Sequence, residues 1–407
     1  MTWASTLEVL PGLVGEVARW IDSTLNRSQP GISIPIALSF VAALKGKRYE
    51  PFEGAYVNLY TCAIAPSGSG KTQAQNAIYQ LIEKSGLPHR FIMGEPASDS
   101  GVLRALQDES RRFLIWDEFG QALRELASST SSHRMLILQL LMKLFSATGA
   151  LYIGKEYAER EQVTIKEPYL SIFASSTAEV FFDSINRNFL HDGFLPRWLI
   201  FFSDFNDKEQ VRRSIQDIPP ELIEKIQYFE NWEPGHKGNL DAVLGQTRKK
   251  LRYNQEDFKE QKEISYNASM PENEEERVIY SRVIEQAAKL CVVLCDGDHI
   301  SSDIMRMAFW LAQKPAKEML ERCNQHLSES HSRNERDKQK IRERFVGLIK
   351  PGERVSARDL YRRCYFLMSA AERYATIKEL CDVGIWDKIE EKTGQRRTTF
   401  YTLNNES

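Results

Sequence analysis

The chain has 407 residues and a formal charge of −2, with 42% hydrophobic and 27% charged residues. This length is enough for two or three domains with a large buried core, and the near-neutral charge argues neither for nor against a nucleic-acid partner. The sequence shows no charged-then-apolar leader, no apolar run near 18 residues and no C-x-x-C pair among its six cysteines, so we expect a cytoplasmic protein with reduced thiols and no membrane partner.

Four segments can be distinguished along the chain. Residues 1–50 place apolar side chains at helical spacing, with a break from Pro30 to Pro35, and predict a helical N-terminal segment. Residues 51–205 alternate apolar strand candidates with helices, the pattern of an α/β fold with a mostly parallel sheet. Residues 206–330 start with a polar stretch and continue with two amphipathic helices, which we interpret as a linker and a helical lid. In residues 331–407, 17 Lys or Arg outnumber 12 Asp or Glu.

The strongest motif is Ala-Pro-Ser-Gly-Ser-Gly-Lys-Thr, from Ala65 to Thr72. It follows an apolar strand expected over 58–65 and precedes a helix expected over 73–85, which is the setting of a phosphate-binding loop. Glycines let backbone N–H groups converge on one anion, the lysine adds charge for the β- and γ-phosphates, and the threonine hydroxyl can bind Mg²⁺. Ala65 stands where the first glycine is usual, and we expect the loop to form nonetheless. The expected nucleotide-binding residues are Pro66, Ser67, Gly68, Ser69, Gly70, Lys71, Thr72 and Gln73.

A second motif ends the apolar stretch 113–116 with two acids, Asp117 and Glu118. A strand of this kind beside a phosphate loop supplies the carboxylates that an NTPase requires. We expect Asp117 to hold Mg²⁺ through water, and Glu118 to orient and deprotonate the attacking water. Apolar stretches ending in two acids are common at strand ends, so the position downstream of the loop is what favours the catalytic interpretation.

A third apolar stretch, 169–177, carries hydroxyl groups at its carboxyl end. Ligands of open α/β sheets lie beyond the carboxyl ends of the strands, so Ser176 and Thr177 are candidates for sensing the γ-phosphate or positioning water. The alternative is that these hydroxyls cap a helix that begins near Ala178, as Ser and Thr often do. The residues support the two interpretations equally.

Arg197 stands just before a fourth apolar stretch, 198–202. In ring ATPases an arginine at this place reaches the γ-phosphate of a neighbouring subunit and stabilises charge in the transition state. A structural ion pair is the alternative, since arginine at a strand edge is rarely left without a partner. Arg187 is the second choice for the same role.

Two parts of the chain are candidates for binding DNA. Residues 150–166 alternate like a β-hairpin and carry Lys155, Arg160 and Lys166, which could contact single-strand phosphates in a ring channel; a solvated charged face is the alternative. Residues 331–407 predict three helices followed by a β-hairpin, the order of a winged helix, with Arg396 and Arg397 on the wing. Winged helices also bind proteins, and acidic residues dilute the charge here, so both kinds of partner stay open.

Together these motifs resemble those of a family of helicase-like ATPases of phages and mobile elements, whose members are often a domain of unknown function or fused to primase-polymerases. The segment of this chain that resembles the family extends from about Leu10 to Leu311. Its most diagnostic pieces are Asp117-Glu-Phe-Gly120 and Gly193-Phe-Leu-Pro-Arg197. The resemblance implies a RecA/AAA+-type P-loop NTPase core, assembled as a ring and acting in DNA replication. Arg197 also matches the arginine before the last core strand of viral and archaeal ring helicases.

The expected activity is therefore hydrolysis of ATP with Mg²⁺ in a hexameric DNA helicase or translocase. Its partners would be single-stranded or forked DNA, further copies of the chain, and a primase or polymerase. Lys71, Glu118 and Arg197 are the expected catalytic residues, and Thr72 and Asp117 the expected metal ligands. The alternative is an ATP-switched initiator, helicase loader or regulator without motor activity. A DNA-packaging or defence ATPase would need an effector that the sequence does not show.

Overall fold

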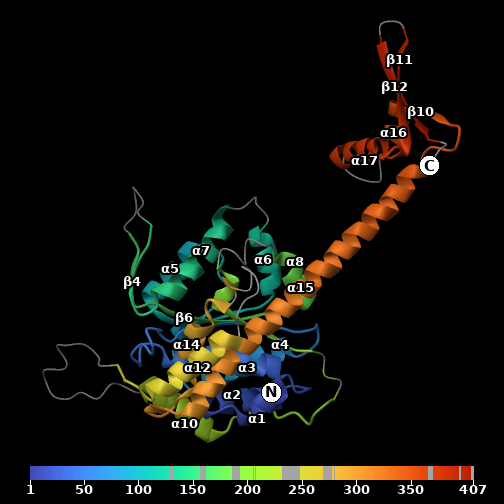
Figure 1. The fold of residues 1–407 in the computed structure, drawn as a ribbon. Helices are drawn as coiled ribbons and strands as arrows, with labels where there is room; N and C mark the ends of the chain where they lie inside the picture. Colours follow the sequence, from blue (N-terminus) through green and yellow to red (C-terminus); the bar gives the residue numbers. More distant parts are fainter. Residues whose placement is uncertain are drawn as a thin grey trace. The chain divides into compact units, whose positions relative to one another are not determined.

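The computed structural model describes residues 1–127, 132–155, 162–185, 193–204, 206, 208–231, 248–268, 277–278, 280–364, 370–393 and 396–404. The chain divides into two compact units, Met1–Cys323 and Asn324–Ser407 (Figure 1). Arg160 and Arg187 lie outside the described residues. The first unit contains the N-terminal helices, the central sheet and most of the segment expected as linker and lid.

A five-stranded parallel sheet forms the centre of the first unit. Its strands are β1 (Tyr60–Ile64), β2 (Ile92–Met93), β3 (Arg111–Trp116), β6 (Tyr169–Ser176) and β7 (Trp198–Phe202). Their order is β2-β3-β6-β1-β7, and Tyr60 of β1 lies opposite Ile172 of β6 and Trp198 of β7. A sheet of this kind needs helices on both faces, because its strands are buried on both sides. The expected α/β class with a parallel sheet is confirmed.

Helices cover the two faces of the sheet in separate layers, because alternate strand residues point to opposite sides. One face, which includes Ala63, Phe113 and Phe201, packs against α2 (Gly12–Thr24), α3 (Pro30–Lys45), α4 (Lys71–Lys84), α10 (Pro220–Asn231) and α14 (Val283–Leu294). The other face, which includes Cys62, Leu114 and Ile200, packs against α5 (Asp99–Asp108), α6 (Phe119–Ala127), α7 (Ser132–Ala147) and α8 (Ala178–Ser184).

Helix α3 is wholly buried after its first residue and crosses the sheet as its central supporting helix. The break expected from Pro30 to Pro35 is wrong. Pro30 occupies the first turn, where the missing N–H would have no partner in any case. Pro35 lies inside the helix, and its carbonyl accepts a hydrogen bond of 2.9 Å from Thr61 Oγ1 of β1. Thr61 of β1 therefore contacts α3 directly at Pro35.

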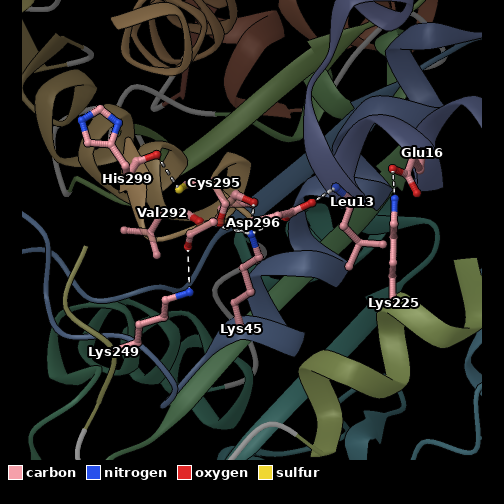
Figure 2. Close-up of polar contacts among 11 residues, drawn as sticks. Leu13, Glu16, Lys45, Lys225, Lys249, Val292, Cys295, Asp296 and His299 are labelled. Atoms are coloured by element: carbon pink, nitrogen blue, oxygen red, sulfur yellow. Dashed lines mark hydrogen bonds and ion pairs between the residues drawn. The ribbon is translucent and has the colours of Figure 1, made fainter. Parts of the chain in front are cut away.

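Lys45, at the end of α3, is a buried cation that joins three helices. Its Nζ donates to the carbonyl of Val293 at 2.8 Å. It also donates to the carbonyl of Cys295 at 2.8 Å and to Asp296 Oδ1 at 2.9 Å (Figure 2). These carbonyls are among those left unpaired where α14 ends. The backbone N–H of Leu13 in α2 donates to Asp296 Oδ2 at 2.6 Å. The C-terminal end of α14 is thus held against α2 and α3.

The amino-terminal end of α14 lies at the amino edge of the sheet, opposite the 65–72 loop. Lys289 Nζ donates to Asn58 Oδ1, two residues before β1, at 2.7 Å. Gln286 Nε2 donates to the carbonyl of Arg197, just before β7, at 2.9 Å. Helix α14 therefore does not cover the loop as a lid would.

The remaining elements of the first unit surround these layers. Helix α15 (Ser302–Val346) begins in this unit, where Ala316 and Met319 line a small cavity together with Leu199 of β7. The other elements are α1 (Trp3–Val9), the 3-10 helices η1 (His89–Phe91) and η2 (Leu195–Arg197), the β4–β5 hairpin (Leu151–Ile153, Thr164–Lys166), β8 (Arg252–Tyr253), α12 (Gln255–Ala268) and β9 (His299–Ile300).

The second unit combines helices with a small antiparallel sheet. After α15 come β10 (Arg354–Ser356), α16 (Ala357–Arg363), α17 (Ala370–Asp382), β11 (Trp386–Thr393) and β12 (Arg396–Leu403), with strand order β10-β12-β11. The side chains of Phe345, Leu360 and Trp386 form part of its core. Ser356 caps α16, because its Oγ accepts from the backbone N–H of Asp359 at 3.2 Å.

Candidate functional site

The sequence motifs meet at the carboxyl edge of the parallel sheet. The 65–72 loop follows β1, Asp117 and Glu118 follow β3, and Ser175 and Ser176 end β6. Because β1, β6 and β3 are neighbours and run in the same direction, these three chain ends lie side by side. Open α/β sheets bind their ligands at this edge.

The loop itself has the backbone geometry of an anion cradle. Gly68 and Gly70 adopt φ values of +76° and +98°, which other residues rarely adopt, and α4 begins directly afterwards at Lys71. Within the described residues, the backbone N–H groups of Lys71 and Thr72 donate to no protein acceptor. Unpaired N–H groups at a helix start attract negative charge, so this loop fits a phosphate group.

The ammonium group of Lys71 lies over the loop. Its Nζ donates to the carbonyls of Ala65 at 2.9 Å and Pro66 at 3.2 Å. Burial lowers the pKa of Lys71, while the nearby charges of Glu118 and Asp117 raise it. The lysine and the two acids therefore act on one another across the ends of β1 and β3.

Ala65 is compatible with the loop because it still belongs to the sheet. Its N–H donates to the carbonyl of Ser176 at 3.0 Å, and its side chain is buried in the core. Its backbone does not adopt a positive φ. A glycine is therefore not required at this position, and the expectation that the loop tolerates alanine agrees with the local geometry.

Asp117 is held by a chain of polar side chains. Ser175 Oγ donates to Asp117 Oδ1 at 2.5 Å, and Gln75 Nε2 of α4 donates to Ser175 Oγ at 3.4 Å. The N–H of Asp117 donates to Glu95 Oε1, which follows β2, at 3.2 Å. The sequence motifs did not single out Ser175, Gln75 or Glu95. Strand alternation could have separated Ser175 from Ser176, because adjacent residues of β6 point to opposite faces.

Ser176 and Thr177 have mainly structural contacts. Ser176 Oγ accepts from the N–H of Gly120, at the start of α6, at 3.2 Å, and the side chain is buried. Thr177 occupies the N-cap position of α8, but its side chain makes no capping hydrogen bond. The hydroxyl that contacts an expected metal ligand is therefore the one on Ser175.

Glu118 has an unusual backbone conformation. Its φ is +47°, and its side chain is exposed. The left-handed region costs a residue other than glycine about 1–2 kcal/mol. The N–H of Glu118 donates to Asp117 Oδ1 at 3.0 Å, and its carbonyl accepts from Gln121 at 2.9 Å. Conformations of this kind are retained mostly where a side chain has to be presented for function.

The described residues include no group of three or more His, Cys, Asp or Glu side chains that could hold a metal by itself. Thr72, exposed in the first turn of α4, and Asp117 offer one hydroxyl and one carboxylate at the same edge. Mg²⁺ commonly binds one or two protein oxygens and completes its shell with water and phosphate. The residues present therefore fit Mg²⁺ bound together with a nucleotide.

Arg197 lies at the opposite edge of the sheet. It ends η2, and the next residue, Trp198, pairs with Tyr60 at the start of β1. The length of β1 therefore separates Arg197 from the loop that follows Ile64, about 15 Å at the usual rise per residue. Its Nη1 donates to the carbonyl of Gly193 at 2.5 Å, and its buried Nε has no hydrogen-bond partner. Arg197 cannot reach the loop of its own subunit.

The expected hairpin over 150–166 is present as the antiparallel pair β4–β5. Lys155 and Lys166 are exposed. The strand residues Leu151 and Ile153 are more than half exposed, so the described outer face is partly apolar. The exposed surface of these two strands is therefore mixed and is not a continuous basic strip for DNA phosphates.

Acidic neighbours neutralise several cations of the second unit. Arg354 pairs with Glu391 at 2.6 Å, and Arg363 pairs with Glu353 at 2.7 Å. The backbones of Arg396 and Arg397 belong to β12, but their side chains lie outside the described part of the chain. The exposed cations of this unit with no ion pair to a described residue are Arg344, Lys350, Arg358, Arg362, Lys378 and Lys392.

Comparison with protein-family models found no matching family, and comparison with curated proteins found no matching relative. Among the described residues, no helix is both long and apolar enough to cross a membrane.

Proposed function

We propose that this protein is a Mg²⁺-dependent ATPase of the P-loop type, with a RecA/AAA+-like core, that assembles as a ring and drives a helicase or translocase on DNA. The observation that carries the proposal is the meeting of Lys71, Asp117 and Glu118 at one edge of the sheet, with Ser175 bonded to Asp117. A phosphate cradle, a metal ligand and a base are the parts that phosphoryl transfer to water requires.

In this proposal each group has a defined role. The unpaired N–H groups at the start of α4 and the ammonium of Lys71 bind the phosphates. Thr72 and Asp117 would hold Mg²⁺, which would neutralise phosphate charge when bound. Glu118 orients a water molecule and accepts its proton on a carboxylate oxygen while the water oxygen attacks the γ-phosphorus. The products are ADP and inorganic phosphate.

Assembly as a ring is supported by the position of Arg197. It lies at the edge opposite its own loop, just before β7. An arginine placed in this way can act only on a nucleotide held by another subunit. An arginine supplied in trans is worth about 10³–10⁵ in the rate of such reactions.

One observation favours the alternative, an ATP-switched initiator, helicase loader or regulator. The order of elements in the second unit agrees with a winged helix, but its cations Arg354, Arg363 and Lys388 are paired with acids. Neutralised cations release few counterions from DNA, so these three would add little to binding of the DNA backbone. In the alternative, the unit serves as a protein-binding module.

Hydrolysis is tested by measuring ATPase activity of the full chain and its variants with Mg²⁺. Lys71→Ala should abolish activity, whereas Lys84→Ala, at the other end of α4, should leave it unchanged. Equal activity of the two variants would refute the proposed site.

Motor activity is tested separately, with a forked DNA substrate and with the mass of the particle measured with and without ATP and single-stranded DNA. Unwinding, DNA-stimulated hydrolysis and a ring-sized particle are expected. Slow, DNA-independent hydrolysis with ATP-dependent assembly would contradict the proposed helicase or translocase. It would favour the ATP-switched initiator, loader or regulator.

A further inference from the structure

A second arginine lies beside Arg197 at the amino edge of the sheet. Gln286 of α14 donates to the carbonyl of Arg197 at 2.9 Å. Arg282 is four residues before Gln286, so the two side chains emerge from the same face of this helical segment. Leu195, Arg282 and Gln286 also line one small cavity. The start of α14 therefore places Arg282 next to the segment that carries Arg197.

Arg282 occupies a position that arginine seldom takes. It is the N-cap residue of α14 and makes no capping hydrogen bond there. Short polar side chains are preferred at this position, and a cation near a helix N-terminus interacts unfavourably with the helix dipole. Local rules are broken in this way mainly at functional sites.

Glu285 is the counter-ion of Arg282, and it is shared. Its carboxylate lies 2.5 Å from Arg282 Nη1 and 3.3 Å from Lys289 Nζ. Lys289 is buried, while the side chains of Arg282 and Glu285 are 33% and 27% exposed. Burial, and then the charge of Arg282, lower the pKa of Arg197, so these arginines act on each other. One carboxylate thus contacts both Arg282 and Lys289.

We propose that Arg282 joins Arg197 in binding the triphosphate of a neighbouring subunit, and that Glu285 holds Arg282 until that phosphate replaces it; the inference rests on the proposed ATPase ring. A triphosphate carries more negative charge than one carboxylate, and arginine binds phosphate oxygens in bidentate geometry. Arg282 is exposed enough for this exchange. Lys289 would keep Glu285 as its partner afterwards.

Mixing of subunits tests the proposal. Arg282→Ala alone should lose at least about tenfold in ATPase activity, since arginines acting in trans are worth more than this. Lys71→Ala should be inactive. The Arg282→Ala subunit keeps an intact loop, and the Lys71→Ala subunit keeps Arg282. In an equimolar mixture that forms rings with head-to-tail contacts, about a quarter of the interfaces combine this loop with this arginine. The mixture should therefore regain up to about a quarter of the wild-type activity.

Two further measurements make the test specific. Glu285→Gln should lower the ATP concentration needed for half-maximal assembly, because the internal competitor is weakened. Arg306→Ala and Asp303→Asn, which break an exposed pair of the same spacing on α15, are the matched controls and should change neither property. Arg282→Ala should unfold at an unchanged denaturant concentration, since Glu285 keeps Lys289.

The outcomes separate this inference from the proposed function. Arg282→Ala with wild-type activity overturns the inference, and so does a mixture that stays inactive while Arg197→Ala with Lys71→Ala recovers. In both cases the ATPase ring stands, and Arg282 and Glu285 only stabilise the start of α14. A wild-type chain that neither hydrolyses ATP nor assembles overturns both proposals.

Discussion

Ser175 Oγ lies 2.5 Å from Asp117 Oδ1 and links the ends of β6 and β3. Ser175 is fully buried, and Gln75 of α4 donates to its hydroxyl. The carboxylate of Asp117 is therefore oriented through α4, the helix whose first turn belongs to the loop. Groups that orient a metal ligand are typically worth about 10–100-fold in metal affinity or activity.

Ser175→Ala should raise the Mg²⁺ concentration needed for half-maximal ATPase activity by about 10–100-fold. Ser171→Ala is the matched control, because Ser171 is buried in the same strand, on the same face, and accepts from the N–H of Leu59 at 3.3 Å. It should cost about 1 kcal/mol of stability without changing the Mg²⁺ requirement. Identical Mg²⁺ titrations for the two variants would remove Ser175 from the site.

Because the backbone of Glu118 is left-handed, replacing this residue by glycine should lower ATPase activity without lowering the stability of the protein. Glu118→Gly relieves a conformational cost of about 1–2 kcal/mol but adds freedom to the unfolded chain, worth about 0.5–1 kcal/mol. The variant should be as stable as the wild type or more stable by up to about 1.5 kcal/mol in urea unfolding. Its ATPase activity should fall by about 10²–10⁴-fold, because the proposed base is absent.

Glu179→Gly, in the first turn of α8, is the control for this substitution. Its backbone is not left-handed, so glycine should destabilise the protein by up to about 1 kcal/mol. If both glycine variants lose stability equally, the conformation of Glu118 is not strained.

Lys45→Met should destabilise the first unit strongly. The substitution removes the donor to the carbonyls of Val293 and Cys295 and the partner of Asp296, so buried polar groups lose their bonds. Each buried acceptor that is left without a donor costs about 1–3 kcal/mol. Lys225→Met, which breaks the partly exposed pair with Glu16, should cost less than about 1 kcal/mol (Figure 2). Urea unfolding compares the two, and similar losses would contradict the role assigned to Lys45.

The features predicted from the sequence were those that a short stretch of chain determines. Apolar runs indicated the strands, and the glycines at 68 and 70 indicated a loop that needs positive φ values. In each case the cause and the structure lie within a few residues of each other.

Features that depend on distant partners were not predicted. Ser175 donates a hydrogen bond to Asp117 because β6 lies beside β3. The order of the strands follows from packing of the whole sheet. From the sequence, Pro35 predicts a break in the helix. In the structure, α3 is buried along its length and continues through Pro35. Helix α14 has the amphipathic pattern expected of a lid, and only its contacts with Asn58 and Arg197 show which edge it occupies.

Lys289 predicts a stability that depends on pH. The group is fully buried, its Nζ lies 3.4 Å from the centre of the Phe145 ring, and burial lowers its pKa to about 7. An unfolded lysine keeps a pKa near 10.4, so between pH 7 and 10 the unfolded state binds more protons than the folded state. Stability from this group therefore rises with pH, by up to about 1.4 kcal/mol per unit, and is lowest below pH 7.

The contribution of Lys289 is isolated by subtracting the unfolding free energy of a variant from that of the wild type. The unfolding free energies of the wild type and Lys289→Met, measured in urea at pH 7, 8 and 9, should diverge in favour of the wild type as the pH rises. Lys317→Met, which removes a lysine from an exposed pair on α15, is the control. If the wild-type and Lys289→Met values stay parallel across this range, Lys289 is charged in the folded protein throughout. Glu285 would then stabilise the ammonium group well enough to offset its burial.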